Sequence, residues 1–186
     1  LEENEKVMTN TVPLSEILPP INDINITHKD LSKKSGADLT FQTIVNIHNT
    51  IIENEKTYDG FLIITGTDSL EELAFSLDIL RKHSKPVVVT GSMKTPCQHG
   101  YDGKSNILES IWVLKSKEVC NKEVLIVMNS RVHCAQYITK SDTQMIPAFD
   151  SSAGPIGEVR SGRVVWYYSA PSPSFKFNFS SLKEIP

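Results

Sequence analysis

The 186-residue sequence predicts an α/β fold in which a parallel β-sheet has helices on both faces. Three short apolar segments, 61–64, 87–89 and 124–128, are rich in β-branched residues, which is typical of buried parallel strands. Segments with helical periodicity separate them. Strands that alternate with helices of about 10–15 residues indicate βαβ units, and right-handed crossovers between such units produce a parallel sheet.

Three helices are expected from apolar residues that recur at i, i+3 and i+4. The first covers about 41–52 with Thr40 as its N-cap, the second begins near residue 70, and the third lies over about 107–114. A last strand is expected at 164–168, and residues 129–161 are expected to be irregular. The residues that define the three apolar stripes are Ile44, Ile47 and Ile51; Leu70, Leu73, Ala74, Leu77 and Leu80; and Ile107, Ile111 and Leu114.

Length and composition indicate one globular domain over residues 1–186. Within it we expect an irregular lead-in over 1–34, a core over 35–168 and a linker over 169–186 toward a further domain. The formal charge of −3 argues against a nucleic-acid binder, which usually has a basic excess. No apolar run approaches the roughly 18 residues needed to span a bilayer, so no membrane segment is expected.

Cysteine and histidine usage favours a protein without a disulfide framework or a metal. The three cysteines, Cys97, Cys120 and Cys134, are an odd number without a Cys-x-x-Cys pair. This pattern is typical of thiols in a reducing compartment, so a cytoplasmic location is expected. The five histidines form no pair with ligand spacing, and no glycine-rich phosphate loop occurs. Neither a metal nor a bound nucleotide phosphate is therefore expected.

The chemistry is expected at the carboxyl ends of the strands, where open α/β sheets bind their ligands. The loops 65–69, 90–103 and 129–142 all leave this edge. In the first loop, Gly66 permits a tight turn, and Thr67 and Asp68 follow it beside the free N–H groups of a helix start. Considered alone, this segment favours a helix cap, with Asp68 and Glu71 as a capping box.

The other two loops also have a structural and a functional interpretation. Lys140 lies among hydroxyl residues after the third strand, where a lysine withdrawn from water can accept a proton from a hydroxyl. Considered alone, a solvated loop lysine is the more common case. The segment Gly100-Tyr101-Asp102-Gly103 has the composition of a turn.

Taken together and in order, these segments resemble the bacterial-type L-asparaginase/glutaminase family of threonine amidohydrolases. The resemblance covers roughly residues 35–165. Four spaced motifs carry it: Gly66-Thr67-Asp68-Ser69-Leu70-Glu71-Glu72, Lys85-Pro86-Val87-Val88-Val89-Thr90-Gly91-Ser92-Met93-Lys94, Asp102-Gly103 with Asn106, and Thr139-Lys140 with Gly154-Pro155-Ile156-Gly157.

The resemblance implies a flavodoxin-like domain and a reaction without a cofactor. A threonine hydroxyl attacks the side-chain amide of L-asparagine, ammonia leaves, and water releases aspartate from the acyl-enzyme. Thr67, Asp68 and Lys140 correspond to the family's Thr–Asp–Lys group, which makes them the expected catalytic residues, and Asp68 can also bind the α-amino group of the substrate. The residues expected to bind substrate are Ser35, Gly36, Gly66 and Ser92.

The sequence also departs from the family pattern. It lacks the Thr-Gly-Gly-Thr strand that carries the family's first catalytic threonine, and Thr65 stands where the family usually has His or Gln. The chain is therefore expected to be the larger domain, truncated at both ends, and to have little activity in isolation. As in the family, a homo-oligomer, either a dimer or a tetramer, is expected.

Two alternatives to a hydrolase remain open at the level of sequence. The protein is then either a catalytically inert relative or the ammonia-releasing subunit of a tRNA-dependent amidotransferase. The preference for asparagine or glutamine also stays open, because one methylene changes discrimination by only about 1–3 kcal/mol.

Overall fold

The structure is a computed structural model that describes residues 21, 23–31, 39–80, 84–119 and 124–169. The expected substrate-binding residues Ser35 and Gly36 lie outside these ranges, as do most of the expected lead-in and linker. Within the described ranges, no helix is both long and apolar enough to cross a bilayer.

The helices and the first strands are found where the sequence predicts them. The helices are α2 (Phe41–Asn54), α3 (Leu70–Ile79) and α4 (Gly103–Lys115), with 3₁₀ turns η2 (Thr67–Ser69) and η3 (Lys117–Val119). Thr40 caps α2, since its side chain accepts the backbone N–H of Thr43 at 3.2 Å, which confirms the predicted cap. The strands are β1 (Phe61–Ile64), β2 (Val87–Thr90), β3 (Leu125–Met128), β4 (Arg131–Cys134), β5 (Ile138–Lys140), β6 (Phe149–Ser151), β7 (Gly157–Arg160) and β8 (Arg163–Trp166).

The α/β class is confirmed, and the main sheet has the strand order β1-β2-β3-β4-β7-β8. Strands β1, β2 and β3 are parallel, with Phe61 opposite Val87 and Val88 opposite Leu125. The carboxyl ends of these three strands therefore lie at one edge of the sheet. The loops predicted to carry the chemistry leave from this edge.

The expected parallel arrangement does not extend beyond β3, and residues 129–161 are not irregular. Strands β4, β7 and β8 are antiparallel to their neighbours. Two-residue turns join β3 to β4 and β7 to β8: Asn129 and Ser130 have φ of 50° and 61°, and Ser161 and Gly162 have φ of 49° and 76°. Positive φ at both central residues matches the right-handed twist of a hairpin. Strands β5 and β6 form a separate two-stranded sheet.

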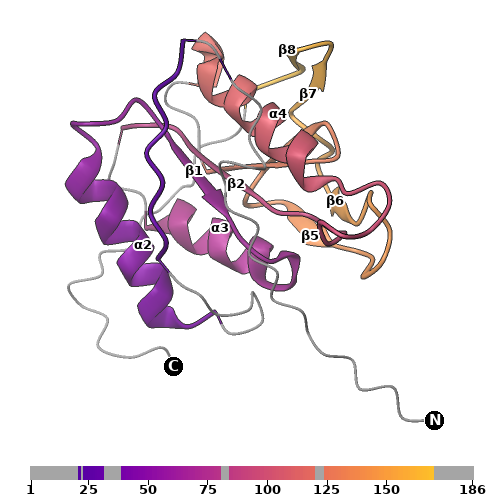
Figure 1. Ribbon diagram of the computed structural model, residues 1–186, viewed down its shortest axis with the longest axis horizontal. Coiled ribbons are helices and arrows are strands. Elements are labelled where there is room, and N and C mark those ends of the chain that lie inside the picture. The colour runs from indigo at the N-terminus through magenta and orange to yellow at the C-terminus, as the bar shows by residue number, and fades with distance from the viewer. Residues whose placement is uncertain (1–20, 22, 32–38, 81–83, 120–123, 170–186) are drawn as a thin grey trace.

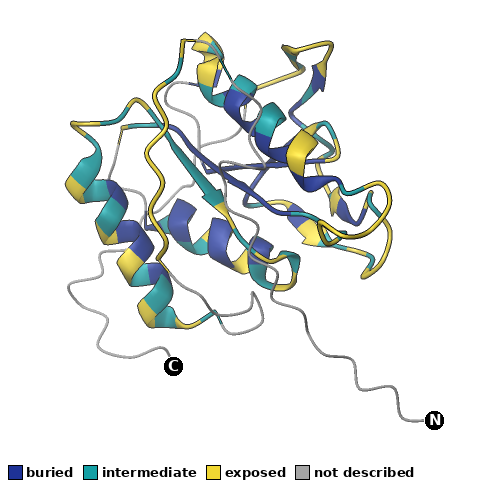
Figure 2. Ribbon diagram, in the orientation of Figure 1, coloured by how far each residue is buried: buried dark blue, intermediate teal, exposed yellow. Residues whose placement is uncertain are grey.

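The core consists of two clusters, one on each face of the main sheet. Helices α2 and α3 lie on one side of β1 and β2, and α4 lies on the other (Figure 1). Along β2, Val87 and Val89 belong to the first cluster and Val88 to the second, as alternation along a strand requires. The buried sides of the helices face the strands (Figure 2). Ile138 and Phe149 of the β5–β6 hairpin join the cluster that contains α3.

Candidate active site

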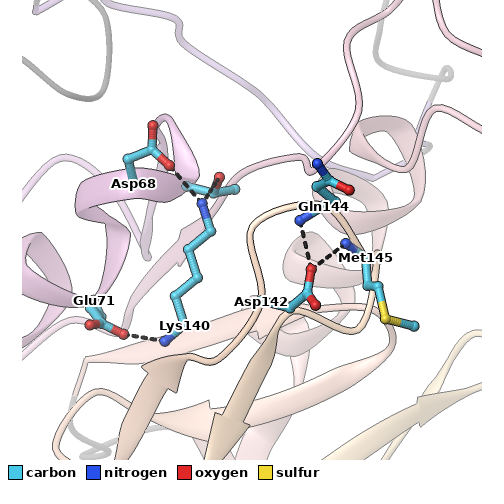
Figure 3. Close-up of polar contacts among 7 residues, drawn as sticks. Asp68, Glu71, Lys140, Asp142, Gln144 and Met145 are labelled. Carbon is cyan, nitrogen blue, oxygen red and sulfur yellow. Dashed lines mark hydrogen bonds and ion pairs between the residues drawn. The ribbon is translucent and has the colours of Figure 1, made fainter.

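The structure brings Thr67, Asp68 and Lys140 together at the carboxyl edge of the sheet. The Lys140 Nζ lies 3.0 Å from the Thr67 Oγ1 and 2.6 Å from the Asp68 Oδ1. The Lys140 side chain is only 12% exposed, whereas the Asp68 side chain is 69% exposed. Figure 3 shows the Lys140 side chain extending from its strand to the Asp68 carboxylate. The amine is thus withdrawn from water at a site whose carboxylate remains open to a ligand.

The end of β1 positions Thr67 and Asp68. Strand β1 ends at Ile64, the Thr65 N–H donates to the Thr90 carbonyl at 3.0 Å, and the chain then enters the 3₁₀ turn Thr67–Ser69. This path requires a glycine at position 91, directly after β2. A Cβ at Gly91 would lie 2.6 Å from the Thr65 carbonyl oxygen and 3.3 Å from the Thr67 Cγ2.

The capping box that the sequence favoured for this segment is not formed. Asp68 lies inside the 3₁₀ turn, and neither the turn nor α3 has a side-chain hydrogen bond from its N-cap. Glu71, the expected second member of the box, instead accepts the backbone N–H of Lys140. The competing tertiary contacts with Lys140 explain this outcome, since both carboxylates are engaged by the same distant residue.

Lys140 is the last residue of β5, the first strand of the β5–β6 hairpin. Beyond Lys140, Ser141 donates its N–H to the Ala148 carbonyl at 2.7 Å. The Asp142 carboxylate then accepts the N–H groups of Gln144 and Met145 at 2.7 and 2.8 Å, which lowers the pKa of Asp142 and closes the loop between the strands (Figure 3). The sequence predicted a loop around Lys140, but the lysine is the last residue of a paired strand.

The loop after β2 is held by Asp102, so the segment 100–103 is more than a turn. The Asp102 carboxylate accepts the N–H groups of Met93 and Lys94, both at 3.0 Å. Ser92 precedes these residues and hydrogen-bonds to Tyr101. Burial raises the pKa of the Tyr101 phenol, and the hydrogen bond from Ser92 opposes that effect.

Buried Asn106 joins this loop to the next strand end. Its Nδ2 donates to the Gly91 carbonyl and to the Asp102 carboxylate, each at 2.9 Å, and its Oδ1 accepts the Asn129 N–H at 3.1 Å. Asn106 thereby fixes the ends of β2 and β3 relative to the start of α4. The motif pattern placed Asn106 at the start of a helix, but nothing in the sequence indicated these three contacts.

The expected site residues thus differ in how the structure places them. Thr67, Asp68 and Lys140 form one cluster, and Gly66 is the residue immediately before their 3₁₀ turn. Ser92 lies in the neighbouring loop, where its hydrogen-bond partner is Tyr101 and not a member of the cluster. In the part of the chain that the structure describes, no group of three or more His, Cys, Asp or Glu side chains is arranged to hold a metal.

Comparison with known proteins assigns the chain to a family. The family model described as asparaginase, N-terminal, matches residues 2–172. The chain belongs to the asparaginase family. The geometry of the Thr67–Asp68–Lys140 cluster makes it a candidate active site within this asparaginase-family domain.

Individual asparaginases agree with this assignment. The chain is 30% identical to L-asparaginase 2 of Escherichia coli, over 93% of this chain and 51% of that protein, and 30% identical to a probable periplasmic L-asparaginase of Haemophilus influenzae over the same shares. The crystal structure of a probable cytoplasmic L-asparaginase from Campylobacter jejuni superposes with a TM-score of 0.82 at 25% identity, over 87% of this chain and 53% of that one. The chain thus spans about half the length of the asparaginases it matches.

Proposed function

We propose that the protein carrying this chain hydrolyses the side-chain amide of L-asparagine to L-aspartate and ammonia. One observation carries the proposal: a sheltered lysine amine contacts both a threonine hydroxyl and an exposed carboxylate. A threonine hydroxyl is a weak nucleophile unless a base removes its proton. Membership of the asparaginase family supplies the reaction class.

In the proposed reaction, the Thr67 oxygen attacks the amide carbon while Lys140, in its amine form, takes the hydroxyl proton. The C–N bond then breaks, and the same proton passes to the leaving nitrogen, so that ammonia departs and an ester remains on Thr67. Water attacks the ester, which releases aspartate and restores the hydroxyl. Asp68 holds the lysine amine by the 2.6 Å contact, and its exposed carboxylate can also bind the α-amino group of the substrate.

The substrate is expected to lie across the start of η2, with Gly66 and Ser92 beside it. Gly66 is exposed and Ser92 is half-buried, so both can be reached from solvent. We retain Ser35 and Gly36 as further candidates from the sequence. This set of groups fits a small amino-acid amide as the substrate.

The test measures ammonia release from asparagine and from glutamine, together with trapping of the acyl-enzyme. Rapid acid quenching followed by mass spectrometry should find the aspartyl ester on the peptide that contains Thr67. An ester on a different threonine would transfer the nucleophilic role to that residue and leave proton transfer to Thr67 and Lys140. Absence of release from either amide would favour a catalytically inert relative, and release only with a charged-tRNA partner would favour an amidotransferase subunit.

We also propose that the protein forms a homo-oligomer and lies in the cytoplasm. Within the described residues, β1 is an edge strand of the main sheet, and edge strands invite pairing with a second chain. The odd number of cysteines supports a reducing compartment, although the named relatives include one periplasmic and one cytoplasmic asparaginase. Light scattering and cell fractionation would test the two proposals.

A further inference from the structure

Two carboxylates of helix α3 contact the part of the chain around Lys140, and only one of them, Glu71, binds Lys140 itself. Near its start, Glu71 accepts the backbone N–H of Lys140. Near its end, Asp78 accepts the Gln136 side-chain amide at 3.1 Å and the Val124 N–H at 2.9 Å. Glu71 and Asp78 are seven residues apart, which is about two helical turns, so they project from the same face of α3.

The contact from Glu71 is made with the main chain of Lys140 and not with its amine (Figure 3). Lys140 lies opposite Phe149 in the ladder, and the neighbouring Ser141 N–H donates to the Ala148 carbonyl. Because hydrogen-bonded and non-hydrogen-bonded pairs alternate in an antiparallel ladder, the Lys140 N–H points away from β6. Without the Glu71 carboxylate, this half-buried N–H would have no other acceptor among the contacts of the hairpin. The positive end of the α3 dipole favours a carboxylate at this position, and a charged acceptor strengthens the bond.

A lysine side chain has four rotatable bonds, so the place of its amine depends on how firmly its main chain is held. The turn that carries Thr67 and Asp68 leads directly into α3, which also carries Glu71. One helix therefore sets the position of the hydroxyl, of the carboxylate and of the main chain that delivers the amine.

We propose that Glu71 is a positioning residue for amide hydrolysis, because it fixes the Lys140 main chain so that Nζ reaches both Thr67 and Asp68. The inference rests on the proposed function for its effect on turnover. Its structural part, the placement of the Lys140 amine, does not depend on any activity.

The experiment compares Glu71→Ala and Glu71→Gln with Gln136→Ala as a matched control. The Gln variant keeps an oxygen that can accept the Lys140 N–H, and Gln136→Ala removes the contact at the other end of α3 without touching Lys140. Two quantities are measured on the whole protein: kcat and KM for ammonia release, and the rate at which an amine-reactive acetylating reagent labels Lys140, followed by mass spectrometry.

We expect Glu71→Ala to lower kcat about 10- to 100-fold with KM within about threefold of wild type, since small displacements of a catalytic group have effects of this size. Labelling of Lys140 should rise several-fold. Glu71→Gln should restore both quantities to near wild type, and Gln136→Ala should leave both nearly unchanged. If Glu71→Ala does not fold, Glu71→Asp, which is one methylene shorter, carries the same comparison with a smaller effect.

Wild-type kcat and wild-type labelling in Glu71→Ala would overturn the proposal. So would an equal loss in Glu71→Gln and Glu71→Ala, because a backbone acceptor would then not be the feature that matters. If the wild-type protein releases no ammonia, the proposed function fails, whereas the labelling of Lys140 still decides whether Glu71 positions it.

Discussion

The Lys140 amine and the Thr67 hydroxyl lie 3.0 Å apart, although 73 residues separate them in the chain. The hydroxyl comes from the turn after β1, and the amine comes from the end of β5. The contact forms because β1 ends at the edge of the main sheet where the β5–β6 hairpin packs against α3.

Lys140→Met should reduce ammonia release about 100- to 10,000-fold, the usual range for loss of a general base. Methionine keeps an unbranched chain in the sheltered position and removes only the amine. Lys115→Met, which alters an exposed lysine in the last turn of α4, should leave turnover unchanged. Steady-state kinetics on both variants checks the prediction, and activity of Lys140→Met within a few-fold of wild type would contradict it.

Thr67→Val should abolish turnover while the protein stays folded. Valine reproduces the shape of threonine without the hydroxyl, so the methyl group that lies close to Gly91 keeps its packing. Thermal unfolding should therefore change little. A variant with full ammonia release would exclude Thr67 from the chemistry.

Asp68→Ala should affect activity much more than stability. Asp68 makes no capping bond, and its ion pair with Lys140 is largely exposed on the Asp68 side, so the expected loss of stability is below about 1 kcal/mol. The matched control is Glu72→Ala, which removes an exposed carboxylate four residues further along the chain. Urea unfolding and ammonia release should be measured on both. A loss of stability with preserved turnover would restore the capping interpretation.

Gly91→Ala should disturb the Thr67 turn through the backbone. A Cβ at this position would lie 2.6 Å from the Thr65 carbonyl oxygen, and a main-chain atom cannot move away without shifting the turn. At Gly60, by contrast, the nearest atom to a Cβ is the Leu114 Cδ2 at 3.0 Å, the end of a flexible side chain. We expect a large loss of kcat for Gly91→Ala and nearly normal kcat for Gly60→Ala. Equal effects would indicate that the Gly91 contact relaxes easily.

Stability should fall as the pH is lowered from 6.5 toward 4, in part because of His133. This side chain is 1% exposed, and neither ring nitrogen has a hydrogen-bond partner among the described residues. Burial, assisted by Arg131, lowers the pKa of His133 from 6.5 to about 4. Between these values the unfolded chain binds a proton that the folded protein does not, which favours unfolding by about 2 kcal/mol at pH 5.

The check for His133 is urea unfolding at pH 7 and pH 5, with His133→Leu as the comparison. The variant lacks the titrating group, so its loss of stability over this interval should be smaller by about 2 kcal/mol. Equal pH dependence in the two proteins would show that His133 does not contribute.

The sequence is sufficient to locate the helices and strands with strong periodicity. The three helices and the strands β1, β2 and β3 follow from apolar spacing and β-branched runs, because burial of one face imposes that spacing wherever the element packs. It also supplied Thr67, Asp68 and Lys140 as candidates, through four motifs in family order. These features depend on residues that are close together in the chain.

The antiparallel half of the sheet and the partners of the polar side chains depend on how distant segments of the chain pack. Strands β4 to β7 mix charged and polar residues with apolar ones, so they lack the apolar runs that mark β1 to β3. The positive φ at Asn129-Ser130 and Ser161-Gly162 that reverses the chain is a property of the folded backbone. Glu71 matched a local capping pattern, but a carboxylate binds whichever donor the fold brings nearest, and that donor is the Lys140 N–H. Spacing along the chain carries no information about such a contact, because packing between distant segments creates it.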